Sequence, residues 1–210
     1  MKYRIGTAVL VGGRSTRMGQ PKENVIIKGD GRTFLEKICD EVDDCYGSCI
    51  VSRYLSIRRG QAAGRTGYTN VEDEYDDIGP LGGFVSVLKR AKTDKLDAVL
   101  FIACDIIGYN KDEIGSICGV YAGEDILWAR TEGKDIQPLA SIYSVRALTA
   151  LEKMAEAGIY RIRDAKEYAD RVGFYDSNNP SAYMNLNSPS DISAFVMTDV
   201  KERKRGNYDT

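Results

Sequence analysis

The 210-residue sequence contains no histidine. This absence excludes Ser-His-Asp and Cys-His catalysis, and it excludes every histidine-ligated metal site. Catalysis would therefore have to rely on carboxylates, lysine, arginine, backbone amides and hard cations. The sequence also lacks an excess of basic residues, because its formal net charge is −2. A general nucleic-acid-binding protein would usually be basic, so that class is disfavoured as well.

Long apolar runs and a disulfide framework are also missing. No segment approaches the roughly 20 apolar residues of a membrane span. The first residues do not follow a signal-peptide pattern, and we therefore expect a cytoplasmic protein. The chain has five cysteines, and it is long enough to form a core without cross-links. The spacing of Cys39, Cys45 and Cys49 matches no common zinc or redox motif, so reduced thiols are expected.

Apolar runs alternate with helical patterns along the chain. Strands are predicted at 4–11, 48–53, 69–74, 97–105, 124–131, 137–145 and 171–177, and helices from 33, from 80, over 110–121, over 146–158 and from 188. The alternation predicts a single-domain α/β fold: a three-layer α/β/α sandwich with a mostly parallel, Rossmann-like sheet. The domain is expected to comprise residues 1–198, and the charged segment 199–210 is expected to be a disordered tail.

A glycine-rich, cationic loop follows the first predicted strand in the stretch TAVLVGGRSTRMGQPK, residues 7–22. Glycines let backbone N–H groups approach phosphate oxygens, and Arg17 and Lys22 supply positive charge. The loop is not a Walker A motif, because Gly13 and Gly19 are separated by five residues and Lys22 does not follow a glycine. The pattern favours an anion site; a charged surface loop is the alternative.

Polar residues also follow other predicted strands. Asp105 ends the apolar run 97–105, where a carboxylate suits Mg²⁺ or, alternatively, caps a turn. The acidic run before GPLGG leads into a glycine-lined helix start whose amides could meet a ribose or base; simple solvent exposure is the alternative. Asn185 and Asn187 share one face of an extended segment and could grip a polar heterocycle, or could form a turn. Ligands of α/β sheets bind beyond the carboxyl ends of the strands, where the loop, the acidic run and Asp105 are expected.

The stretch VLVGGRSTRMGQPK closely resembles the signature of the nucleotidyltransferases that activate small metabolites as nucleotides. GPLGG, ACD, QPLASIY and MNLNSPSDI follow in the order seen in the molybdenum cofactor guanylyltransferase family, from Thr7 to about Phe195. The resemblance implies a sheet of the nucleotide-diphospho-sugar transferase type. It also implies transfer of GMP from GTP to molybdopterin with release of pyrophosphate, and Mg²⁺ or Mn²⁺ as cofactor.

The resemblance implies roles for individual residues as well. The nucleotide would contact Leu10, Gly12, Gly13, Arg17, Lys22, Asp73 (or the neighbouring Glu72), Gly79, Leu81 and Gly82. Arg17, Lys22 and Asp105 would be catalytic, with Asp105 as the metal ligand, and Asn185 and Asn187 would bind the pterin. The sequence departs from the family pattern at three places: Ile106-Ile107-Gly108 replaces the usual Met-Pro, Val11 replaces an alanine, and Ala140 replaces a histidine.

The implied reaction needs no protein nucleophile, which suits a chain without histidine. The terminal phosphate of molybdopterin would attack the α-phosphorus of GTP, and catalysis would consist of positioning and charge neutralisation. Two alternatives remain: a cytidylyltransferase or another metabolite-phosphate nucleotidyltransferase, and a non-catalytic nucleotide-binding protein that delivers cofactor. Expected partners are the two substrates, together with cofactor-insertion proteins or molybdenum or tungsten enzymes. Neither nucleic acid nor a membrane is expected.

Overall fold

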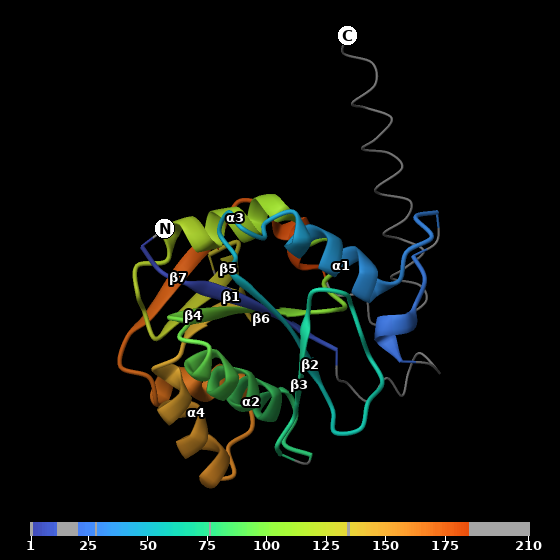
Figure 1. Ribbon diagram of the computed structural model, residues 1–210. Coiled ribbons are helices and arrows are strands. Elements are labelled where there is room, and N and C mark those ends of the chain that lie inside the picture. Colours follow the sequence, from blue (N-terminus) through green and yellow to red (C-terminus); the bar gives the residue numbers. More distant parts are fainter. Residues whose placement is uncertain (1, 12–20, 28, 76, 134, 185–210) are drawn as a thin grey trace.

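A computed structural model describes residues 2–11, 21–27, 29–75, 77–133 and 135–184, which contain one seven-stranded sheet (Figure 1). The strands lie in the order β3-β2-β1-β4-β6-β5-β7. Their bounds are β1 Ile5–Leu10, β2 Ser52–Ile57, β3 Thr69–Glu72, β4 Ala98–Ala103, β5 Ile126–Thr131, β6 Asp135–Ser144 and β7 Val172–Ser177. β6 pairs antiparallel with both neighbours, and the other strand pairs are parallel, as predicted.

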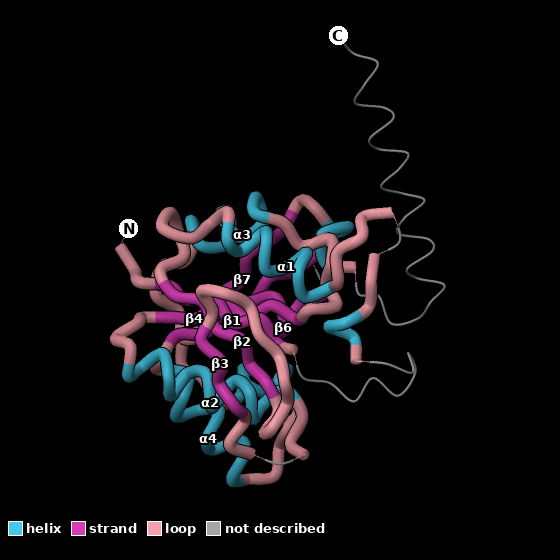
Figure 2. Tube along the Cα trace, turned by 45° about the vertical axis from the view of Figure 1, so that its right-hand side comes forward, coloured by secondary structure: helices cyan, strands magenta, loops and turns pink. Residues whose placement is uncertain are grey.

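Helices cover both faces of the sheet. The bounds are α1 Phe34–Asp43, α2 Pro80–Thr93, α3 Lys111–Val120 and α4 Ala147–Glu156, with 3₁₀ turns η1 Lys22–Asn24, η2 Ile162–Glu167 and η3 Pro180–Tyr183. α1 and α3 lie over one face, and α2 and α4 lie over the other (Figures 1 and 2). This arrangement confirms the three-layer α/β/α sandwich. Among the described residues no helix is both long and apolar enough to cross a membrane.

The sequence of β4 is continuously apolar because both faces of this strand are buried. Leu100 and Ile102 belong to the buried cluster on the α1 and α3 side, whereas Val99 and Phe101 belong to the cluster under α2 and α4. Because successive side chains point to opposite faces, a strand covered on both faces favours apolar side chains at every position. Phe101 stacks on Phe84 of α2 with ring centroids 3.9 Å apart, so α2 is fixed against the centre of the sheet.

Most local predictions agree with the structure. Thr33 and Glu36 form the predicted capping box at the start of α1, and Pro80 occupies the first turn of α2. All five cysteines are free, as expected for reduced thiols. The terminal helix from residue 188 and the domain boundary at 198 lie outside the described residues.

The position of the second strand was predicted wrongly. It was expected at 48–53, but β2 begins at Ser52. The preceding residues form a tight turn in which the carbonyl of Cys45 accepts the amides of Ser48, Cys49 and Ile50. The apolar pair at 50 and 51 therefore leads into the strand rather than forming its centre. β2 ends at Ile57, four residues later than predicted, so Arg58 is the first residue after its carboxyl end.

Candidate active site

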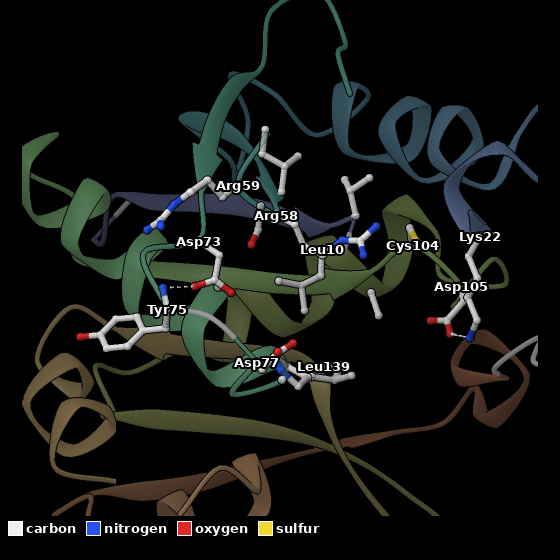
Figure 3. A pocket seen from close by; sticks show the side chains of 17 residues that line it. Leu10, Lys22, Arg58, Arg59, Asp73, Tyr75, Asp77, Cys104, Asp105 and Leu139 are labelled. Carbon is white, nitrogen blue, oxygen red and sulfur yellow. Dashed lines mark hydrogen bonds and ion pairs between the residues drawn. The ribbon is translucent and has the colours of Figure 1, made fainter. Parts of the chain in front are cut away.

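A cavity of about 800 Å³ lies at the carboxyl ends of β1, β2, β3 and β4 (Figure 3). It is lined by Leu10, Val11, Lys22, Ser56, Ile57, Arg58, Arg59, Asp73, Tyr75, Asp77, Gly79, Pro80, Gly83, Ala103, Cys104, Asp105 and Leu139. The parallel strands explain this convergence, because the segments that follow them must emerge at one edge of the sheet. Three features that are far apart in the sequence thus share one cavity: the lysine after the glycine-rich loop, the acidic run and Asp105.

Lys22 and Asp105 form an ion pair at one end of the cavity (Figure 3). The distance from Lys22 Nζ to Asp105 Oδ2 is 2.6 Å, and the two side chains are 22% and 17% exposed. Asp105 lies just beyond β4, whereas Lys22 begins η1. The pair is thus partly shielded from water but still reachable from the cavity, as a site for a charged ligand requires.

The segment that carries Lys22 is anchored by a small apolar cluster. Val25 and Ile27 follow η1 and pack with Phe34 and Ile107. Ile26 forms an antiparallel β-bridge with Thr33, which brings the residues after η1 beside the start of α1. Because Ile107 follows Asp105 closely in the chain, the same contact that anchors the lysine segment also places it beside the aspartate.

This packing accounts for the departure from the family pattern at Ile106-Ile107-Gly108. Ile106 is 2% exposed and belongs to the main cluster under α1 and α3, while Ile107 belongs to the cluster that holds the lysine segment. A Cβ atom on Gly108 would lie 2.6 Å from the carbonyl oxygen of Ser181, so the backbone of η3 can approach only a glycine here. The tripeptide therefore serves the packing around Asp105.

Asp73 lies toward the opposite end of the cavity, near Arg59 and Tyr75 (Figure 3). It follows β3, and its Oδ1 accepts the backbone N–H of Tyr75 at 2.9 Å. The alternative residue, Glu72, does not line this cavity but a separate shallow depression beside α2. Of the two acidic residues that could contact the nucleotide, Asp73 lines this cavity and Glu72 does not.

Some of the predicted site residues line the cavity, some lie beside it, and others are outside the described residues. Leu10, Lys22, Asp73, Gly79 and Asp105 line the cavity. Gly82 faces Asp73 from α2, and the side chain of Leu81 is buried in the cluster under α2 and α4. Gly12, Gly13, Arg17, Asn185 and Asn187 lie outside the described residues. Ala140, at the position where the family has histidine, is completely buried in β6.

Sequence reasoning missed the paired arginines of the cavity. Arg58 and Arg59 directly follow β2 and line the cavity, and Arg59 donates to the carbonyl of Glu74 at 3.4 Å. Two consecutive cations after a strand are a signal for such a site, but the predicted strand ends at residue 53 and β2 ends at Ile57. Asp77 was also not singled out; it adopts a left-handed backbone with φ 59° at the cavity wall.

The cavity contains one thiol, Cys104. Burial raises the pKa of Cys104 well above the usual value for a cysteine, so the thiol stays protonated at neutral pH. A protonated, buried thiol is a poor nucleophile. This agrees with a reaction in which the protein contributes no nucleophile.

Replacing Gly82 by alanine is expected to weaken binding of a nucleoside triphosphate about tenfold. A Cβ at this position would clash with both carboxylate oxygens of Asp73, which must then swing away and lose the bond to the Tyr75 amide. Calorimetric titration measures the loss. Gly115→Ala in α3 is the matched control, because nothing lies near its Cβ, and its affinity should be unchanged. Equal affinities for both variants would contradict a binding role for Asp73.

Comparisons with known proteins agree with this geometry. Residues 7–172 match a family model described as the MobA-like NTP transferase domain. A Vibrio campbellii protein named "Molybdenum cofactor guanylyltransferase" is 25% identical over 188 residues, covering 89% of this chain and 92% of that protein. A Clostridium perfringens protein named "Probable molybdenum cofactor guanylyltransferase" is 30% identical over 146 residues, or 70% and 69% of the two chains.

A solved structure agrees with the fold. The protein from Archaeoglobus fulgidus described as molybdopterin-guanine dinucleotide biosynthesis protein A superposes with a TM-score of 0.73 at 20% identity. The match covers 93% of this chain and 99% of that one. It confirms the architecture of the predicted α/β sandwich. Because the family model extends from β1 to the first residue of β7, the chain belongs to the MobA-like NTP transferase family and is a nucleotidyltransferase.

Proposed function

We propose that this protein transfers GMP from GTP to molybdopterin and releases pyrophosphate. The observation that carries the proposal is the Lys22–Asp105 pair at one end of a cavity whose other end holds Asp73. A nucleoside triphosphate is elongated, with charge at one end and a base at the other, and a cavity of about 800 Å³ can accommodate it. The names of the similar proteins from Vibrio and Clostridium support guanylyl transfer to this cofactor.

In this proposal the two ends of the cavity bind different parts of GTP. Lys22 contacts the β- and γ-phosphates, together with Arg17 and the backbone amides of Gly12 and Gly13. Asp73 and the first residues of α2, from Gly79 to Gly82, contact the ribose and base, where glycines let the ligand approach the backbone. Leu10 contributes apolar contact between the two ends. Asn185 and Asn187 would bind the pterin of the second substrate.

The chemistry follows from this placement. An oxygen of the molybdopterin phosphate forms a bond to the α-phosphorus of GTP, and the bond from that phosphorus to the bridging oxygen of the β-phosphate breaks. The electron pair leaves with pyrophosphate. Lys22 stabilises the charge that accumulates on the leaving group, and the protein holds the attacking oxygen in line with the bond that breaks. No residue of the chain forms a covalent intermediate.

The donor set around Asp105 fits Mg²⁺ or Mn²⁺. Oδ2 of Asp105 pairs with Lys22, while no hydrogen bond or ion pair engages Oδ1 within the described part of the chain. Mg²⁺ in such sites is typically held by one or two carboxylates plus substrate phosphates and water. When bound, the ion would neutralise negative charge on the reacting phosphates. Asp105 would hold it, while Lys22 contacts the leaving group.

Titration of the protein with GTP and with CTP, both with Mg²⁺, tests the nucleotide assignment. We expect GTP to bind at least about tenfold more tightly than CTP, a difference of about 1.4 kcal/mol. Preference for CTP would keep the cavity and the mechanism but replace the guanylyl assignment by a cytidylyl one. Binding of neither would contradict the triphosphate site.

A turnover assay with molybdopterin then tests the second substrate through release of pyrophosphate and formation of the dinucleotide. Nucleotide binding without pyrophosphate release would favour a cofactor-delivery protein instead. Location in the cytoplasm, and transfer of the product to insertion proteins or molybdenum or tungsten enzymes, belong to the same proposal.

A further inference from the structure

The side chain of Gln61 contacts three segments that reach the cavity. It lies in the loop after β2, where its Oε1 accepts the backbone N–H of Arg58 at 3.0 Å. Its Nε2 donates to Glu23 Oε1 at 2.5 Å and to the carbonyl of Val11 at 3.4 Å. One amide therefore connects the first residue after β1, the η1 turn and the first residue after β2.

The contact with Glu23 is the strongest part of this connection. Glu23 directly follows Lys22 in the chain and is only 7% exposed. A carboxylate that is almost completely buried requires a hydrogen-bond donor, because its lost hydration must be replaced. Nε2 of Gln61 is such a donor, and a bond from an amide to a charged oxygen is stronger than one between neutral groups. Gln61 therefore holds the η1 turn on the side of Glu23, in addition to the apolar cluster that anchors Val25 and Ile27.

Through the contact with Val11, Gln61 also binds the residue that precedes the glycine-rich loop. Val11 precedes residues 12–20, and Lys22 and Glu23 follow them. The backbone N–H of Val11 also donates to the carbonyl of Ser56 in β2 at 2.9 Å, so this end is fixed to the sheet. Gln61 thus sets the separation between the two ends of the loop. It does so without being one of the residues that line the cavity.

We propose that Gln61 is a positioning residue that holds Lys22 in place for the triphosphate. It acts through Glu23 and Val11 and makes no contact with the nucleotide. The inference rests on the proposed function, because it assumes that Lys22 contacts the β- and γ-phosphates. Loss of Gln61 would leave the strands and α2 in place, but it would release the η1 turn from the end of β1. The Gln61 side chain makes no hydrogen bond to Asp73 or to α2 within the described part of the chain, so the ribose and base end should keep its structure.

The test compares two ligands on Gln61→Ala. We expect the affinity for GTP to fall about tenfold and the affinity for GMP to stay within twofold of wild type, because GMP lacks the phosphates that reach Lys22. Asn70→Ala is the matched control, since Asn70 donates through its side-chain amide to the carbonyl of Ala63 in the same loop without contacting Val11 or Glu23. This control should bind both ligands as wild type does.

A double-mutant cycle separates positioning from a general loss of structure. If Gln61 acts through Lys22, Gln61→Ala should not lower the affinity for GTP any further in a Lys22→Ala background. Independent effects of the two substitutions on the binding free energy would instead add. Gln61→Glu preserves the size of the side chain but places a carboxylate against Glu23, and it should weaken GTP binding more than alanine does. The inference would be overturned if the two substitutions lowered the affinity for GTP additively, or if Gln61→Ala lowered the affinities for GTP and GMP equally. A wild-type protein that binds no GTP would instead contradict the proposed function.

Discussion

Asp105→Ala is expected to reduce pyrophosphate release at least about 1,000-fold, the scale of losing a group that stabilises transition-state charge. Asp105 is the carboxylate beyond the central strand β4, it lies in the cavity, and it faces Lys22 at 2.6 Å. Without it the site loses the oxygen donor proposed for the metal. The reacting phosphates would then repel one another with less compensation. The measurement is steady-state turnover with GTP and molybdopterin at saturating Mg²⁺.

The fold should survive this substitution. Asp105 is partly exposed, and its hydrogen-bond partner among the described residues is the side chain of Lys22 rather than the backbone of another element. Asp105→Asn keeps the shape of the side chain and should lose nearly as much activity, since a neutral amide is a weak ligand for Mg²⁺. Asp112→Ala, on the exposed first turn of α3, serves as the control. Turnover close to wild type in Asp105→Ala would refute the metal assignment.

Lys22→Ala is expected to weaken GTP binding by about 30-fold, equivalent to about 2 kcal/mol. Bonds between an ammonium group and phosphate oxygens are charge-assisted, and the side chain is only 22% exposed, so screening by salt is incomplete. The loss should be smaller for GDP and absent for GMP. Calorimetric titration with the three nucleotides at one ionic strength gives the comparison.

Two further variants sharpen the interpretation of Lys22. Lys22→Arg retains the positive charge and should recover part of the affinity, although the guanidinium group is larger and cannot approach the phosphates in the same way. Lys37→Ala is a suitable control, because Lys37 is paired with Glu41 on α1 and does not line the cavity. If Lys22→Ala lowered the affinities for GTP and GMP equally, the lysine would not be a triphosphate ligand.

The parts of the fold that could be predicted are those encoded by adjacent residues. The residues from Ala98 to Cys104 are all apolar and Asp105 follows them, which allowed both a strand buried on two faces and a carboxylate at its end to be predicted. Thr33 and Glu36 identified the start of α1 in the same way, because a capping box is formed within one helical turn. The location of the cavity then followed from a general property of parallel sheets.

The parts that could not be predicted depend on contacts between distant segments. Ile50 and Val51 look like the centre of a strand, but the hydrogen bonds to the Cys45 carbonyl place Ile50 in a turn. This shift hid Arg58 and Arg59, which would otherwise have been assigned to the site by their position after a strand. Gln61 gives no local signal at all. Its role depends on Glu23, which lies 38 positions earlier in the chain.

The separate packing of the lysine segment gives the two walls of the cavity different local stabilities. Val25, Ile27, Phe34 and Ile107 form a cluster apart from the two large ones that hold the sheet and its helices. Local opening free energies follow the amount of buried apolar surface, so we expect the segment with Lys22 to open more readily than the elements held by the two large clusters. A ligand that touches both walls adds its binding energy to the closed state by mass action. Once the bond between pyrophosphate and the nucleotide is broken, no single ligand contacts both walls. The wall expected to open more readily is then the one beside pyrophosphate.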